Sequence, residues 1–201
     1  IIDVTPGTED QDPKPDYVRF IFNAVGKDAE NNTVQGKVKG NKVYAFDVLK
    51  GTAFNDTDLQ DKVKDLKAIA DANNYKFEKW DPEVKNDATL VEAGESGTEV
   101  TKHEYTAVYA KLPKIIEDPT TNTPEDGYVR LTFDATDAGR IGTADGEQKK
   151  VIDVLKGTPY TDKDLKDKLD EIKAVPVKAD GGSTVKDTEK AFDKWTPAVP
   201  T

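Results

Sequence analysis

The 201-residue sequence contains no cysteine, no methionine and a single histidine. Without cysteine the chain cannot form a disulfide bond, a zinc-finger cage, an iron–sulfur cluster or a thiol nucleophile. One histidine leaves little for a histidine-based metal site or a serine–histidine relay. No apolar run approaches the roughly 18–20 residues that span a bilayer. We therefore expect no catalytic residues, no cofactor, no bound metal and no membrane span.

Negative charge exceeds positive charge, because the chain has 39 acidic and only 29 basic residues, which give a formal net charge of −10. Nucleic-acid binding depends on clustered lysine and arginine, so this balance argues against a nucleic-acid partner. Aromatic residues, which disordered acidic chains lack, are spread along the sequence as seven Phe, seven Tyr and two Trp. The composition therefore indicates small, folded and well-hydrated domains.

Three sequence blocks occur twice in the same order. The pairs of blocks are 17–24 with 128–135, 47–52 with 153–158, and 77–84 with 192–199. The middle pair is identical (Asp-Val-Leu-Lys-Gly-Thr), and the first pair shares Tyr-Val-Arg at its start. Repeated blocks in one order indicate that a single unit has been duplicated in tandem.

The duplication predicts the domain boundaries. We expect one repeat domain over 16–113 and a second over 127–201, separated by a linker at 114–126 that is rich in proline, threonine and acidic residues. Residues 1–15 have similar composition and predict the linker from a preceding repeat. The second copy shows no counterpart of 104–111, so we expect its last strand to be missing.

Hydrophobic periodicity predicts the elements of each copy. Alternating apolar residues predict strands over 17–22, 42–49, 75–80 and 104–111, with copies of the first two over 128–133 and 149–155. Apolar residues at helical spacing predict one helix in each copy, with the stripes Leu59, Val63, Leu66, Ile69 and Leu165, Leu169, Ile172, Val175. The order β-β-α-β-β predicts an α+β fold of two tandem β-grasp-like domains, each a small sheet packed on one helix.

Acidic residues cluster just before each predicted helix. Asn55 and Thr161 suit the N-cap position, with Asp58 and Asp164 three residues later. A calcium loop would need oxygen ligands at alternate positions, and a leucine interrupts each cluster where ligands should continue. Helix capping is therefore the preferred interpretation of both clusters.

Two aromatic positions recur between the copies, Phe77 with Phe192 and Trp80 with Trp195. They could stack on a sugar or contact a protein partner, but a large aromatic residue is also the main apolar contribution of a small domain. We prefer the interpretation that these residues anchor the core.

Two further candidates have simpler structural explanations. His103 is adjacent to Glu104 and Tyr105 and could form an acid–base group, but a lone histidine at the start of an exposed strand is more often a surface residue. Arg19 and Arg130 lie on the outer face of the predicted first strand, where cross-strand charge pairing or protection of a sheet edge explains them without a ligand.

The order of four motifs resembles a known class of repeats. They are Tyr-Val-Arg-x-x-Phe, Val-Leu-Lys-Gly-Thr, Lys-Phe-Glu-Lys-Trp-Asp-Pro and Tyr-Thr-Ala-Val-Tyr-Ala-Lys. Together they resemble tandem repeats of cell-wall-anchored surface proteins of Gram-positive bacteria, namely the β-grasp-like internalin B-repeat (Listeria–Bacteroides) type and streptococcal stalk repeats. The resemblance implies an extracellular, wall-attached spacer and supplies no catalytic residues.

We therefore expect a non-enzymatic pair of stalk domains from a bacterial surface adhesin, which project a distal binding region. Such a segment would be monomeric, and its partners would be the neighbouring repeats of its own chain. The alternative is that the repeats themselves bind a host matrix protein, an immunoglobulin or a glycan, with repetition adding avidity.

Overall fold

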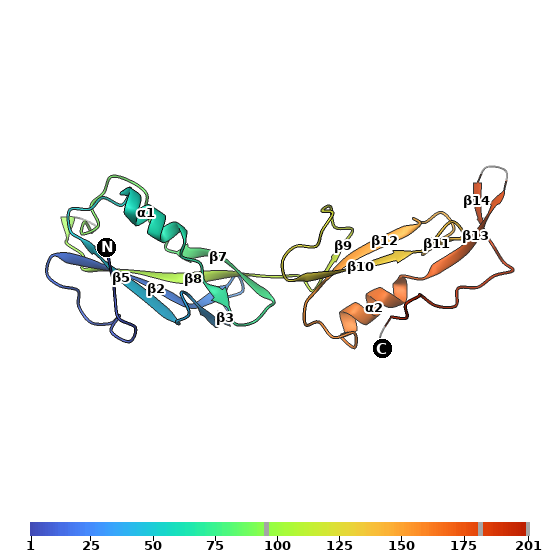
Figure 1. Ribbon diagram of the computed structural model, residues 1–201, viewed down its shortest axis with the longest axis horizontal. Helices are drawn as coiled ribbons and strands as arrows, with labels where there is room; N and C mark the ends of the chain where they lie inside the picture. The colour runs from blue at the N-terminus through green and yellow to red at the C-terminus, as the bar shows by residue number, and fades with distance from the viewer. Residues whose placement is uncertain (95–96, 181–182, 200–201) are drawn as a thin grey trace. The chain divides into compact units, whose positions relative to one another are not determined.

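In a computed structural model, which describes residues 1–94, 97–180 and 183–199, the chain folds into two compact units, Ile1–Leu112 and Pro113–Thr201 (Figure 1). Each unit contains one helix, α1 (Thr57–Lys64) in the first and α2 (Lys163–Glu171) in the second. No helix in these described ranges is long and apolar enough to cross a membrane.

The predicted α+β fold of two tandem β-grasp-like domains is wrong, because the protein is mainly β. Strands hold 42% of the residues and helices only 9%. Both helices are shorter than their predicted apolar stripes. The last residue of each stripe lies in a strand instead, in β6 (Ile69–Ala70) and β13 (Ala174–Asp180).

Long-range pairing explains this difference. β6 pairs with β4 (Gly36–Lys37), and β13 pairs with β11 (Gly139–Ile141). Both partners lie between the first two predicted strands of their copy, in segments where no strand was predicted. Because the hydrogen bonds of a sheet come from residues distant in sequence, helical spacing alone could not show where each helix ends.

The main sheet of the first unit has the strand order β1-β5-β2-β8-β7, and a further short strand, β3, pairs with β2. Neighbours along the sheet are antiparallel except for the central pair β2 and β8, which is parallel. The strands are β1 (Ile2–Asp3), β2 (Tyr17–Asp28), β3 (Thr33–Val34), β5 (Val43–Leu49), β7 (Tyr75–Asp81) and β8 (Lys102–Lys111).

The core of the first unit lies between this sheet and α1 (Figure 1). Alternate residues of β2 supply Phe20 and Phe22, and the helix supplies Leu59, all fully buried. β8 adds Tyr105, whose ring centroid lies 4.8 Å from that of Phe22 in a stacked arrangement, and Tyr109, which is also fully buried. A central strand thus carries much of the aromatic core.

The second unit is built from smaller sheets. β10 (Tyr128–Asp134), β12 (Lys149–Leu155) and β9 (Ile115–Glu117) form one sheet in the order β10-β12-β9. β13 lies between β11 and β14 (Ser183–Lys186) in another. In the described ranges no strand lies beside β10 on the side opposite β12, so β10 is an edge strand.

The two segments that were expected to be linkers contain strands. β1 pairs with β5, with Ile2 opposite Asp47, and β9 pairs with β12, with Ile116 opposite Asp153. Both strands therefore occupy equivalent positions in the two copies. Their pairing was not visible in the local composition, because acidic residues and proline also suit an unpaired linker.

Each helix is capped one residue later than predicted. The N-caps are Asp56 and Asp162, and their carboxylates accept hydrogen bonds from the backbone N–H of Leu59 and Leu165 at 3.1 and 3.3 Å. Capping is the correct interpretation of the two clusters, but the choice of Asn55 and Thr161 was wrong. An ionised carboxylate at the positive end of the helix is a stronger acceptor than an amide or hydroxyl oxygen.

Candidate functional site

The repeated arginines form buried ion pairs across neighbouring strands. Arg19 lies opposite Asp47 in register, and its Nε and Nη2 atoms donate to the two carboxylate oxygens at 2.8 and 3.0 Å. Arg130 holds Asp153 in the same way at 2.7 and 2.8 Å. The prediction of cross-strand charge pairing is therefore confirmed.

Arg19 also fixes the segment that follows β1. Its Nη1 atom donates to the backbone carbonyls of Thr8, Glu9 and Gln11 at 2.9, 3.2 and 2.6 Å. This segment covers the guanidinium, which is why a residue of the predicted outer face is buried. All its contacts serve the fold, and none points to a ligand.

Trp80 and Trp195 perform the same structural task in their units. Trp80 Nε1 donates to the carbonyl of Leu66 at 2.9 Å, and Trp195 Nε1 donates to the carbonyl of Ile172 at 3.0 Å. Trp80 is only 6% exposed, which confirms it as a core anchor. Trp195 is half-buried, so its ring contributes both to the core and to the surface of the second unit.

His103 was expected to be a surface residue, and this expectation is wrong. Its ring packs against Phe20 and Phe54, with centroids 5.0 and 5.2 Å away, and its Nε2 atom lies 2.6 Å from the carbonyl oxygen of Val91. Glu104 is exposed, as expected for the opposite face of the strand, so these two residues do not form an acid–base group. The sequence could not show this burial, because it depends on contacts between His103 and two residues outside β8, Phe54 and Val91.

The half-buried ring of His103 gives the first unit a predicted pH dependence. Burial, with a smaller contribution from the charge of Lys85, lowers the pKa of His103 below its ordinary value of 6.5. The unfolded chain therefore binds a proton more readily than the folded chain, so stability is fully present above about pH 6.5 and falls below it. We expect His103→Gln to reduce the loss of stability as the pH falls below about 6.5, measured as the denaturant midpoint at each pH.

In the second cluster, the carboxylates of Asp162 and Asp164 are also bound by a lysine. Lys114 Nζ donates to the carboxylates of Asp162 and Asp164, at 2.9 Å from each. These bonds raise the pKa of Lys114 to about 12, and the bond from Lys114 lowers the pKa of Asp162. Within the described ranges, no group of three or more histidine, cysteine or acidic residues could hold a metal ion.

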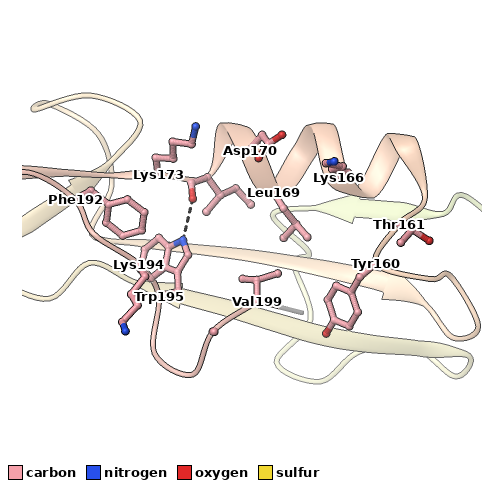
Figure 2. A pocket seen from close by; sticks show the side chains of 12 residues that line it. Tyr160, Thr161, Lys166, Leu169, Asp170, Lys173, Phe192, Lys194, Trp195 and Val199 are labelled. Atoms are coloured by element: carbon pink, nitrogen blue, oxygen red, sulfur yellow. Dashed lines mark hydrogen bonds between the residues drawn. The ribbon is translucent and has the colours of Figure 1, made fainter. Parts of the chain in front are cut away.

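The second unit contains an apolar cavity of about 420 Å³ beside α2. Figure 2 shows Trp195 and Val199 facing Leu169 of the helix, with Tyr160 at one end and Phe192 beside the indole. The ring centroids of Phe192 and Trp195 are 5.1 Å apart. The lining is mainly apolar, so such a cavity can accept an apolar or aromatic group.

A groove of about 560 Å³ adjoins this cavity along the open edge of β10. One wall is formed by residues 130–134 of β10 and the other by residues 195–199, and Tyr160, Trp195 and Val199 line both spaces. The sequence marked Trp195 but missed the groove.

Comparison of this chain with protein families, with curated proteins and with solved structures finds no match.

Proposed function

We propose that the chain is a pair of non-catalytic spacer repeats from a bacterial cell-surface protein, which separate a distal binding region from the cell wall. The observation that carries the proposal is that the repeated polar residues serve the fold in both copies. The Arg–Asp pairs, the two tryptophan N–H groups and the two N-cap carboxylates make equivalent bonds within each unit. These bonds within each unit account for the repeated polar groups without a reaction.

The short connection between the units also supports the proposal. β8 ends at Lys111 and β9 begins at Ile115. Within the first unit, the N–H of Leu112 donates to the carbonyl of Asn74 at 2.8 Å. Within the second unit, the hydroxyl of Tyr128 donates to the carbonyl of Pro113 at 2.7 Å. Each end of the connection is therefore bonded within its own unit, and only a few residues separate the two units along the chain, as a series of spacer repeats requires.

Small-angle X-ray scattering of the 201-residue chain tests this function. We expect an elongated monomer with a maximum dimension of roughly 70–90 Å, about twice that of one domain of this size. Inserting a Gly-Ser segment between Leu112 and Pro113 provides the control and should broaden the distance distribution. A compact particle of side-by-side units would contradict the spacer function.

Direct binding of a host protein or glycan by both repeats has less support. Trp80, Tyr105 and Tyr109, the aromatic residues that would supply a binding patch in the first unit, are buried. In the second unit, Phe192 and Trp195 line an apolar cavity. Any recognition of a partner through these aromatic positions is therefore expected in the second unit alone.

A further inference from the structure

Two strands of the first unit, β2 and β8, are neighbours in the main sheet and run parallel. β2 begins at Tyr17, and β8 ends at Lys111, just before the connection to the second unit. Arg19 lies opposite Lys102 near one end of the pair, and Asp28 lies opposite Tyr109 near the other. The chain therefore reaches this pair of strands at one end and leaves it at the opposite end.

This arrangement determines how a pulling force along the chain acts on the unit. The preceding chain pulls on the start of β2, and the following chain pulls on the end of β8 in the opposite direction. The hydrogen bonds of the sheet run between the strands, so a force along the strands loads many of them at once. Forced unfolding depends on the unfolding rate, and breaking several bonds in one step makes that rate slow.

An antiparallel pair pulled at one end responds differently. β2 and β5 are antiparallel, with Tyr17 opposite Leu49 at one end of the pair. A force that separates these two ends opens the hydrogen bonds one after another. The same sheet should therefore resist force strongly in one direction and weakly in the other.

Side chains also join β2 to β8. The hydroxyl of Tyr109 in β8 donates to the carbonyl of Ala24 in β2 at 2.6 Å. The ring of Tyr105 stacks on Phe22, with centroids 4.8 Å apart. Both contacts must break when one strand slides along the other, so they add to the resistance of the backbone bonds.

A glycine in β2 allows the two strands to approach closely. A Cβ at Gly26 would lie only 1.8 Å from the carbonyl oxygen of Ala107, so no larger residue fits at this point. Gly26 lies within the irregular stretch of the pairing, between Asn23 and Lys27. The two backbones are therefore in direct contact where the ladder of hydrogen bonds is interrupted.

The β2–β8 pair lies in the middle of the sheet. β5 covers the other side of β2, and β7 covers the other side of β8. Phe20, Phe22 and Tyr109, which belong to these two strands, are fully buried. Water cannot readily replace hydrogen bonds in this position, so they persist until the strands themselves move.

We propose that β2 and β8 form a mechanical clamp, which keeps the first unit folded when the chain is under tension. The proposal rests on the proposed spacer function, because a spacer between a cell wall and a distal binding region carries any force applied to that region. The clamp adds that the first unit keeps its length while it transmits this force.

Pulling one protein in two directions tests the clamp. The natural chain has no cysteine, so introduced cysteines fix where DNA handles attach in optical tweezers. Asp16→Cys with Lys111→Cys loads β2 and β8 in shear, whereas Asp16→Cys with Leu49→Cys separates β2 from β5 at one end. All three positions are exposed. Both pairs are placed in the full 201-residue chain and leave the second unit outside the load.

At the same force, unfolding in shear is expected to be at least about tenfold slower than unfolding by separation of β2 from β5. This is the effect of two or more additional hydrogen bonds broken in one step. The gain in extension, up to roughly 3.3–3.6 Å for each residue between the handles, identifies the unfolding event. Thermal unfolding without load is the control and should agree between the two variants.

A matched pair of substitutions in the shear variant tests the contact between the strands. Tyr109→Phe removes the hydroxyl that binds Ala24 and should make unfolding under load about fivefold faster, as expected for one hydrogen bond. Tyr44→Phe makes the same chemical change, but its hydroxyl binds Asp3, which lies outside the loaded segment. It should leave the rate of unfolding under load within about twofold of the parent rate.

Two results would overturn the clamp. One is an equal rate of unfolding in the two pulling directions, a comparison that leaves the buried residues of the natural chain unchanged. The other is an equal effect of Tyr109→Phe and Tyr44→Phe. Neither result alters the particle shape measured by X-ray scattering, so failure of the clamp is distinguishable from failure of the spacer function.

Discussion

Replacing Trp80 with alanine is expected to lower the free energy of unfolding of the first unit by about 3–5 kcal/mol. The indole is almost fully buried, and its ring centroid lies 5.0 Å from that of Phe22 and 5.0 Å from that of Phe77. Alanine leaves a cavity in this aromatic cluster and removes the donor to the carbonyl of Leu66. A single domain is stable by only about 5–15 kcal/mol, so this loss is a large part of the total.

The repeat provides the matched control for this prediction. Trp195→Ala should cost clearly less, because Trp195 is half-buried although it makes the equivalent hydrogen bond to Ile172. Trp80→Phe should have an intermediate effect, since it keeps an aromatic ring but leaves a buried carbonyl without its donor. Guanidinium unfolding by circular dichroism, with hydrogen exchange to assign each transition, measures all three. Equal losses for the two alanine variants would contradict the role of burial.

Replacing Arg19 with alanine is expected to destabilise the first unit by about 3–5 kcal/mol. The change leaves the carboxylate of Asp47, whose side chain is 13% exposed, without its bidentate partner. It also removes the donor that binds three backbone carbonyls in the segment after β1. Hydrogen exchange should therefore increase in residues 1–15 as well as in β2 and β5.

A double-mutant cycle separates the ion pair from the packing around it. The cycle compares Arg19→Met, Asp47→Leu and the combined variant, which should cost less than Arg19→Met alone because no unpaired charge remains. Both variants lose the donor to the three backbone carbonyls, so this loss cancels in the comparison. Lys62→Ala provides a more solvated comparison, since the carboxylate of its partner Asp3 is 63% exposed. Its ion pair with Asp3 is partly solvated, so the expected cost is at most about 1 kcal/mol. If Arg19→Ala has no larger effect than Lys62→Ala, the buried pair does not hold the sheet as described.

Features that depend on local patterns could be read from the sequence. The identical block at 47–52 and 153–158, together with the repeated Tyr-Val-Arg motif, indicated the duplication. Alternation in β2 and β10 predicted strands, and the position of Arg19 and Arg130 on those strands predicted cross-strand pairing. Each of these properties follows from residues within one strand or from the simple geometry of neighbouring strands.

Features that depend on contacts between distant segments could not be read in this way. Helical spacing extended to Ile69 and Val175, but both residues pair with strands more than 30 positions earlier in the chain. His103 was expected at the surface, yet the rings of Phe20 and Phe54 and the carbonyl of Val91 enclose it. The residues next to a position in the sequence do not reveal which distant residues it contacts in the fold.

The sequence alone determined that this protein is a duplicated, acidic chain whose repeated residues recur in a fixed order. Only the tertiary structure decided that the chain is mainly β, that the segments before each repeat join its sheet, and that β10 pairs only with β12 among the described residues. The physical reason is the same in each case. A strand is stabilised by hydrogen bonds to a partner elsewhere in the chain, so its extent and its free side are known only once that partner is placed.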